Sequence, residues 1–264
     1  MQTQSLLLKK VIFRFFCVFA LSFSLGFLFG CGTSGPPHPS GLAVMGGPEG
    51  TLIRQDLYHE VARMETLWRI GKMYGVDVNA IMAANGLKNP NSIEVGQKLL
   101  IPKAATAARS VIPLYHTRPW TYIVIHHSAT HNGNALMIDK VHFRRGFENG
   151  LGYHFLIDNG TLGKGLGQIE IGPRWVKQEN GAHCNAAGMN ENGIGICLIG
   201  NYSETYVPDI QLESLVFLVN TLRAHYQIPL DHIIRHRDVP GKNTECPGNY
   251  FPWDEFKRRL KASP

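Results

Sequence analysis

Two short apolar runs constrain the fold of this 264-residue chain more than any other feature of its sequence. They are Thr121–His126 and Ile194–Ile199, and neither contains an acidic residue, a lysine or an arginine. Runs of this length without polar alternation are typical of strands that are buried on both faces of a sheet. Such strands require helices above and below them.

The surrounding sequence, residues 111–264, supplies the other elements of that sheet domain. Helix and strand patterns alternate along it, and Asn159-Gly160 is a hairpin signal at the end of one strand. The predicted helices are Asn134–Phe147, Asp209–Tyr226 and Trp253–Leu260, and the further strands are Tyr153–Asp158 and His232–His236. The sequence therefore predicts an α/β domain with a mixed central β-sheet flanked by helices.

A smaller domain is predicted over residues 58–102. Its elements are a strand at Tyr58–Val61, a helix capped by Thr66, a second helix capped by Asp77 and a closing strand at Lys98–Ile101. This order gives a βααβ module. A polar, Ala-rich stretch, residues 103–110, is predicted to link it to the sheet domain.

Residues 1–30 have the layout of an export signal. Lys9, Lys10 and Arg14 precede the apolar run Phe15–Gly30. Serines and a glycine interrupt that run, which is shorter than the ~20 apolar residues that a membrane-spanning helix needs. Cleavage is therefore favoured over a permanent transmembrane anchor.

Cys31 is predicted to carry a lipid. Gly30 and Cys31, preceded by Leu28, resemble the lipobox of bacterial lipoproteins, in which the cysteine is lipidated and becomes the mature N-terminus. The Gly/Pro/Ser-rich sequence that follows suits a flexible tether over residues 31–57. The alternative is an ordinary signal peptide with an incidental cysteine.

Charge argues against a nucleic-acid partner. Removing residues 1–30 lowers the formal net charge from +6 to +3, a mildly basic balance that suits the surface of an anionic cell-wall polymer. No run of lysine and arginine with interleaved aromatic residues occurs in the sequence.

Three cysteines lie beyond the export segment and the predicted lipidation site: Cys184, Cys197 and Cys246. An odd number outside the cytoplasm leaves at least one thiol unpaired, reactive or metal-bound. Whether Cys184 and Cys197 form a disulfide stays open.

Two strand-end histidines and one loop cysteine have the chemistry of a metal site. His126 ends an apolar strand, and its neighbour His127 must point to the opposite face. His236 ends another strand and is followed by a Pro/Gly-rich loop that leads to Cys246. Two imidazoles and a thiolate would suit Zn²⁺ and leave a fourth position for water, as in catalytic zinc sites. Sequence spacing alone does not show that the three residues meet.

Five short motifs are spread over residues 111–260. They are IleValIleHisHisSerAlaThr (123–130), GlyTyrHisPhe (152–155), GlyAlaHis (181–183), GlyIleGlyIleCysLeuIleGlyAsnTyr (193–202), and HisArgAspVal with GluCysProGly (236–248). In sequence and in order, they resemble the zinc-dependent N-acetylmuramoyl-L-alanine amidases, a family that includes phage amidases and peptidoglycan recognition proteins.

The resemblance assigns roles by position. It implies that His126, His236 and Cys246 are the zinc ligands, that Tyr153 is the catalytic tyrosine, that Thr244 stabilises charge and that His183 lines the substrate cleft. The loop before the metal cysteine is longer than the family pattern by Gly241-Lys242, so Lys242 is the alternative source of positive charge.

The smaller domain, residues 58–102, has its own set of motifs. They are TyrHisGluVal (58–61), GluThrLeuTrpArgIle (65–70), TyrGlyVal (74–76), AlaAsnGly (84–86) and ValGlyGlnLysLeuLeuIlePro (95–102). These stretches resemble a LysM domain, which binds glycan chains containing N-acetylglucosamine. Met64-Glu65 replaces the usual Gly-Asp, a change that implies reduced affinity for sugar.

Together, these resemblances imply hydrolysis of the amide between N-acetylmuramoyl and L-alanine in peptidoglycan by a zinc-activated water. Tyr153 would orient or help to deprotonate that water and bind the oxyanion. No covalent intermediate is needed, so Cys246 as a nucleophile is the poorer interpretation. We expect a monomeric, exported lipoprotein that is anchored to a lipid membrane and faces the periplasm or cell wall. If the cell is Gram-negative, that membrane is the outer one. Glycan strands would bind the LysM domain, and the stem peptide would enter the amidase cleft.

Two other functions are open at this stage. One is a catalytically silent module that recognises peptidoglycan, which the presence of Cys246 and Tyr153 argues against. The other is the same enzyme acting on soluble muropeptides rather than on the intact wall.

Several polar residues have simpler interpretations. His131 and His142 lack motif support and are expected at the surface, and His154 is expected in the core, facing away from Tyr153. Asp238 either orients His236 through a hydrogen bond or shapes the loop.

Overall fold

The computed structural model describes residues 37–45, 54–105 and 110–262. The predicted export signal, residues 1–30, and the predicted lipidation site, Cys31, lie outside these ranges. Within the described ranges, no helix is both long enough and apolar enough to cross a bilayer.

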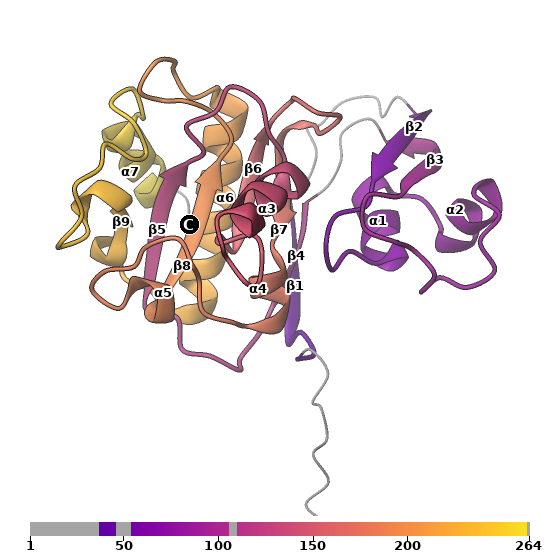
Figure 1. The fold of residues 1–264 in the computed structure, drawn as a ribbon, viewed down its shortest axis with the longest axis horizontal. Helices are drawn as coiled ribbons and strands as arrows, with labels where there is room; N and C mark the ends of the chain where they lie inside the picture. Colours follow the sequence, from indigo (N-terminus) through magenta and orange to yellow (C-terminus); the bar gives the residue numbers. More distant parts are fainter. Residues whose placement is uncertain (1–36, 46–53, 106–109, 263–264) are drawn as a thin grey trace, which may run out of the picture. The chain divides into compact units, whose positions relative to one another are not determined.

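A five-stranded sheet forms the centre of the larger domain (Figure 1). The strands run in the order β7-β6-β8-β5-β9, and only the β6–β7 pair is antiparallel. Their bounds are β5 Tyr122–His127, β6 Phe155–Asn159, β7 Leu166–Ile171, β8 Gly193–Leu198 and β9 Ile233–Arg235. The predicted mixed sheet is thus confirmed, and the two apolar runs become its adjacent parallel strands β5 and β8.

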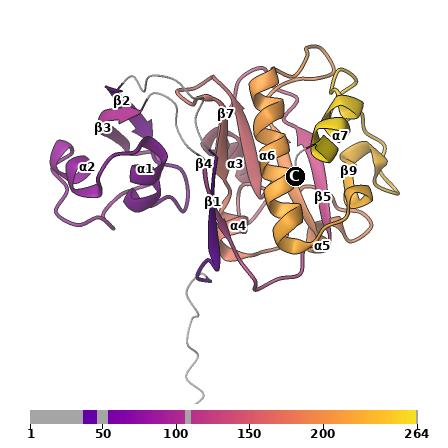
Figure 2. The same ribbon diagram turned by 180° about the vertical axis from the view of Figure 1, so that it is seen from behind.

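Alternation along β5 sends its side chains to two different cores. Ile123 and Ile125 join the main cluster, which includes buried leucines and valines of the long helix α6, Asp209–Tyr226. Figure 2 shows α6 lying across this face of the sheet. Val124 faces the opposite side and packs with Met189.

Shorter helices complete the larger domain. Ala135 and Ile138 of one of them pack against the sheet residues Leu156 and Cys197 on the face opposite α6. The helices are α3 Ala135–Arg144, α4 Pro173–Lys177, α5 Met189–Asn192 and α7 Trp253–Ala262, with 3₁₀ turns η1 Leu230–His232 and η2 His236–Asp238. Asn134 caps α3, because its side chain accepts a hydrogen bond from the Met137 amide at 2.8 Å.

The hairpin signal at Asn159-Gly160 marks the turn between β6 and β7. Gly160 has φ +83°, a left-handed conformation that glycine adopts without strain. The loop is longer than a two-residue turn, since Asn159 pairs with Leu166.

The smaller domain has the predicted βααβ order. It consists of β2 Arg54–Glu60, α1 Leu67–Tyr74, α2 Val78–Ala84 and β3 Lys98–Ala105, with β2 and β3 antiparallel. Thr66 and Asp77 cap the two helices as predicted, accepting from the amides of Arg69 and Asn79. The fully buried core consists of Leu67, Ile70, Ile81, Leu99, Ile101 and Ala104.

The turn before α1 explains what Met64-Glu65 does in place of Gly-Asp. Met64 has φ +64°, a conformation that glycine adopts more readily than a residue with a side chain. The buried Glu65 carboxylate accepts hydrogen bonds from the Ala62 amide at 2.7 Å and from the His59 ring at 2.8 Å. The substitution therefore keeps the turn but uses Glu65 internally.

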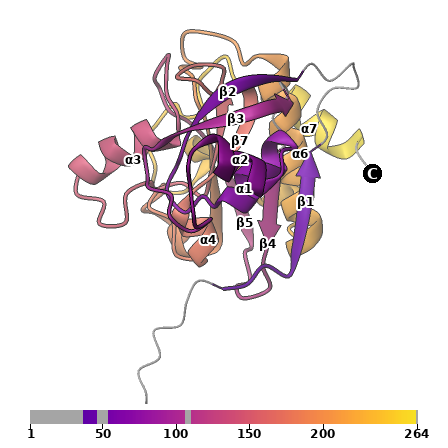
Figure 3. The ribbon, with the colours of Figure 1, turned by 90° about the vertical axis from the view of Figure 1, so that its right-hand side faces the viewer.

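Two strands enter residues 31–57, where the sequence predicted a flexible tether: β2 begins there, at Arg54, and another strand lies wholly within the range. β1, Gly41–Met45, pairs antiparallel with β4, Ser110–Leu114, which begins at the end of the predicted linker. The tether prediction is wrong for β1 because Ala43 and Met45 pack against the main core of the larger domain. Figure 3 shows the two strands side by side. The smaller domain therefore occupies the connection between two strands of one ladder.

Candidate metal centre

The end of β5 places His126 inside the protein on the face opposite α6. Its Nδ1 lies 3.7 Å from the Cys246 sulfur, and its Nε2 lies 3.1 Å from Nδ1 of His183. His127 points the other way, as predicted, and its Nδ1 accepts a hydrogen bond from the Tyr202 amide at 3.1 Å. Only one histidine of the pair therefore serves this centre.

Strand pairing brings His236 to the same edge of the sheet. β9 is parallel to β5, with Arg235 opposite Ile125, so His236 follows β9 beside His126. Asp238 does not orient His236: its carboxylate accepts from the Arg235 guanidinium at 2.7 and 2.8 Å and shapes the turn.

Arg237 folds the loop back so that Cys246 reaches the centre. Its amide donates to the Cys246 carbonyl at 2.9 Å, and its guanidinium donates to the Glu245 carbonyl and to Oδ1 of Asn249, each at 2.9 Å. The Pro/Gly-rich loop is thus closed by one arginine.

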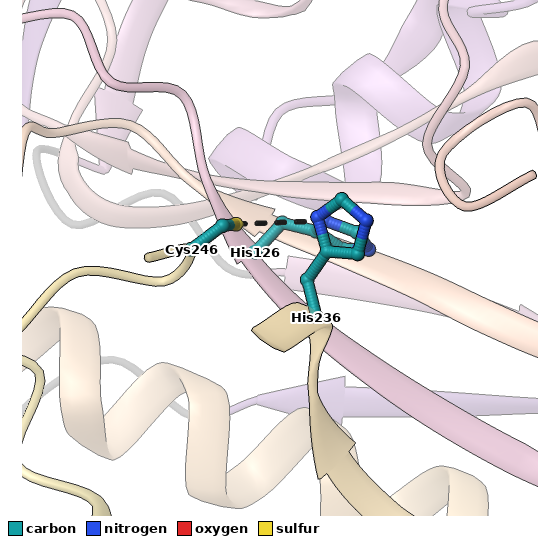
Figure 4. Close-up of side chains that lie close together, drawn as sticks. All are labelled: His126, His236 and Cys246. Atoms are coloured by element: carbon teal, nitrogen blue, oxygen red, sulfur yellow. Dashed lines mark hydrogen bonds between the residues drawn. The ribbon is translucent and has the colours of Figure 1, made fainter. Parts of the chain in front are cut away.

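His126, His236 and Cys246 converge, with one ligand atom from each lying within 4.8 Å of the others. Figure 4 shows the three side chains pointing toward one another. Around a tetrahedral zinc ion, sulfur and nitrogen ligands lie about 3.6 Å apart, close to the 3.7 Å between Cys246 and His126. Nε2 of His236 is buried without a hydrogen-bond partner, as expected of an atom that binds an ion. The donor set therefore fits a metal.

Burial sets the protonation of these groups. It lowers the pKa of His126 well below its usual value and, with the charge of Lys242, that of His236 to about 4. The same effect raises the pKa of the Cys246 thiol to about 12. Neutral imidazoles can bind a cation, whereas the thiol on its own stays protonated at neutral pH and is a poor nucleophile.

Tyr153 lies beside the triad. Its ring centroid is 5.2 Å from that of His126 and 5.5 Å from that of His142. Burial raises the pKa of its phenol well above 10, and the neighbouring Cys197 and Cys246 thiols add to the effect. Tyr153 therefore stays protonated and can donate a hydrogen bond.

Thr244 and Lys242 both lie on the loop that carries Cys246. The Thr244 hydroxyl accepts from the Cys246 amide at 3.2 Å, which leaves its proton free for another partner. The charge of Lys242 lowers the pKa of His236, so this ammonium lies within electrostatic reach of the ligands.

His183 occupies a different place from the one expected of a residue that lines the substrate cleft. It is 8% exposed, and its two ring nitrogens lie 3.1 Å from His126 Nε2 and 3.1 Å from the Gly193 carbonyl oxygen. Neither ring nitrogen of His183 is left to bind substrate, and the ring lies next to His126.

Two residues near Tyr153 were missed. His142 is 9% exposed rather than at the surface, and its Nδ1 accepts from the Gly152 amide at 3.0 Å. It shares the buried face of α3 with Ala135 and Ile138, a helical spacing that could have predicted its burial. Cys197 lies opposite His126 in the β5–β8 register.

The structure also places the other cysteines and His154. Cys184, Cys197 and Cys246 are all unpaired, so Cys184 and Cys197 form no disulfide. His154 is fully buried and bonds only to backbone, with Nδ1 accepting from the Gly195 amide at 3.0 Å and Nε2 lying 3.1 Å from the Glu179 carbonyl oxygen.

An open three-ligand centre beside a tyrosine is the arrangement of a hydrolytic metalloenzyme. Residues 116–249 match the N-acetylmuramoyl-L-alanine amidase family, and residues 59–102 match the LysM domain. The amidase match spans half of the sequence, so the chain belongs to the N-acetylmuramoyl-L-alanine amidase family. The chain is thus an amidase that acts on peptidoglycan and carries a LysM domain, as its motifs predicted.

Individual relatives agree with this assignment. The endolysin of Enterobacteria phage T3 is 32% identical over 136 residues, covering 47% of this chain and 78% of the phage protein. The endolysin of Escherichia phage T7 is 31% identical over 115 residues, covering 40% and 68%.

Solved structures that resemble part of the chain include a Clostridium amidase and a Drosophila PGRP. The amidase LysC from Clostridium intestinale URNW is 37% identical, with a TM-score of 0.47 and coverage of 57% of this chain and 91% of that one. Drosophila PGRP-LB is 27% identical, with a TM-score of 0.40 and coverage of 55% and 79%.

The triad makes a direct prediction about metal content. Cys246→Ala should lower the bound metal, measured by mass spectrometry of the purified protein, from one ion per chain to well below one, because a neutral methyl replaces the only sulfur ligand. Cys184→Ala is the matched control, since Cys184 is a buried free thiol outside the triad. Equal metal in the wild type and both variants would contradict the site.

Proposed function

We propose that this amidase cleaves the bond between N-acetylmuramoyl and L-alanine with a zinc ion held by His126, His236 and Cys246. The observation that carries the proposal is the convergence of two neutral imidazoles and a thiol whose ligand atoms lie within 4.8 Å. When bound, zinc polarises the scissile carbonyl and lowers the pKa of a coordinated water to about 7. The direct test is amide cleavage of purified sacculi before and after chelation, with recovery on adding Zn²⁺.

The chain's own residues supply orientation and hydrogen bonds. Tyr153 is protonated and adjacent to His126, so we assign it to donate a hydrogen bond to the oxyanion that develops on the scissile carbonyl. Its raised pKa makes a role as general base the weaker choice. Thr244 or Lys242 supplies the second contact to that oxygen.

Tyr153→Phe tests the first assignment. Losing one oxyanion donor should lower kcat on purified sacculi about 10²–10³-fold with bound zinc unchanged, because the phenol contacts substrate rather than metal. Tyr122→Phe, at the opposite end of β5, is the control and should leave kcat unchanged. Full kcat in the Tyr153→Phe variant would remove Tyr153 from the mechanism.

The same assay separates Thr244 from Lys242. Thr244→Val keeps the shape of the side chain and removes the hydroxyl, whereas Lys242→Met keeps its length and removes the charge. The variant with the larger loss of kcat identifies the contact. No loss in either would leave the oxyanion to Tyr153 alone.

We further propose that the LysM domain holds the enzyme on glycan strands. Binding to a polymer raises the local concentration of the cleavage site without changing the chemistry. The LysM domain can be deleted without breaking the β1–β4 ladder. Met45 and Ser110 are the last paired residues of that ladder, and a two-residue Asn-Gly turn can join them.

Replacing residues 46–109 with Asn-Gly should reduce cleavage of sacculi more than cleavage of small soluble muropeptides, compared by initial rates. A truncation that starts at Ser110 is the structural control, since it also removes β1 and should unfold at a lower temperature. Equal losses on the two substrates with the hairpin variant would sink the glycan-holding role and leave soluble muropeptides as substrate.

Export and lipidation at Cys31 complete the proposal, since peptidoglycan lies outside the cytoplasm. Cys31→Ala should abolish incorporation of labelled palmitate and shift the protein from the membrane fraction to the soluble one. Cys17→Ala, within the same export segment, should do neither. A wild-type protein that takes up no labelled palmitate and stays in the soluble fraction would instead support an ordinary signal peptide with an incidental cysteine.

A further inference from the structure

A chain of hydrogen bonds runs from the backbone to the metal centre through two imidazoles. The Gly193 carbonyl oxygen lies 3.1 Å from His183 Nε2, and His183 Nδ1 lies 3.1 Å from His126 Nε2. The remaining nitrogen, His126 Nδ1, faces the Cys246 sulfur. Each ring nitrogen in this chain therefore has one neighbour.

The carbonyl determines where the protons lie along the chain. A carbonyl oxygen only accepts, so His183 must donate to Gly193 from Nε2. Nδ1 of the neutral His183 ring then carries a lone pair and accepts from Nε2–H of His126. His126 is left with its lone pair on Nδ1, the atom that points toward the other ligands. The opposite tautomer of His126 would place a proton where the metal must bind.

The protein shapes this place for an imidazole. A methyl group added at Gly195 or at Gly181 would collide with the His183 ring, so both positions need glycine for close approach. Asn190 holds the backbone on either side, because its Oδ1 accepts from the amides of His183 at 2.9 Å and Cys184 at 2.8 Å. The ring is thus fixed in position and in orientation.

We propose that His183 is a positioning residue that fixes the tautomer of His126, so that Nδ1 of His126 is presented to the metal. The inference rests on the zinc role assigned to the triad. In this proposal His183 contacts the metal ligand His126 and not the substrate, because both of its ring nitrogens already have hydrogen-bond partners.

Zinc affinity is the measurement that tests this inference, with chelator competition on the full chain. His183→Ala should weaken binding about 10–100-fold, the usual effect of losing a partner of a metal-ligating histidine. His225→Ala is the control: it removes a half-buried histidine of α6, on the opposite face of the sheet, whose Nε2 lies 3.1 Å from the Tyr115 carbonyl oxygen, so it should leave zinc affinity unchanged.

Two amide variants make the test specific to the Nδ1 position. His183→Asn places an oxygen acceptor near Nδ1, whereas His183→Gln reaches toward Gly193 and lacks that acceptor. The His183→Asn variant should bind zinc with an affinity closer to that of the wild type than the His183→Gln variant does. This comparison stands even if the alanine variant fails to fold. A zinc affinity of His183→Gln that equals or exceeds that of His183→Asn would overturn the inference, as would an unchanged zinc affinity in His183→Ala.

Failure of the broader proposal would look different. A wild-type protein that binds no zinc, or that cleaves sacculi fully after chelation, would refute the zinc mechanism itself. A wild-type protein that binds zinc and cleaves, with the four variants ranked otherwise, would refute only the role of His183.

Discussion

Parallel pairing of β5 with β9 is the constraint on which the metal centre depends. The register places Arg235 opposite Ile125, and the next residue of each strand is a histidine. Because neighbouring strands lie about 4.8 Å apart, this pairing alone brings the two imidazoles within reach of one ion. Burial of β5 between two layers makes the register hard to shift, since a slip by one residue would exchange His126 for His127.

The third ligand depends on a different kind of interaction. Cys246 lies on a loop with little regular structure. Arg237 sets the position of that loop, because its amide and its guanidinium donate hydrogen bonds to Glu245, Cys246 and Asn249. The centre thus combines two imidazoles that the sheet holds in place with one thiol on a loop that Arg237 holds in place. The thiol proton and a metal ion compete for the space in front of His126 Nδ1, so metal binding must release that proton.

Much of the fold was readable from the sequence. The helix Asp209–Tyr226 has the predicted bounds, and Thr66 and Asp77 cap their helices as predicted, because local side-chain chemistry decides where helices start. β1 was missed because its pairing partner, β4, lies beyond the whole LysM domain. Local composition carries no record of such a distant partner.

For the site, some features were predicted before the structure and others were not. Family resemblance named the triad, but its convergence came from strand register, which sequence spacing does not reveal. The place of His183 depends on two glycines and a carbonyl that only the folded chain brings together. His142 was misjudged because motif support was weighed above helical periodicity.

The β1–β4 ladder also links the stability of the two domains. The LysM domain begins and ends on paired strands, with Arg54 opposite Ala105, so the folded domain keeps its own ends together. While the LysM domain is folded, pairing β1 with β4 therefore closes only a short effective loop. Unfolding of the LysM domain would lengthen that loop and raise the entropic cost of the pairing. A glycan that stabilises the LysM domain consequently also stabilises an edge of the amidase core.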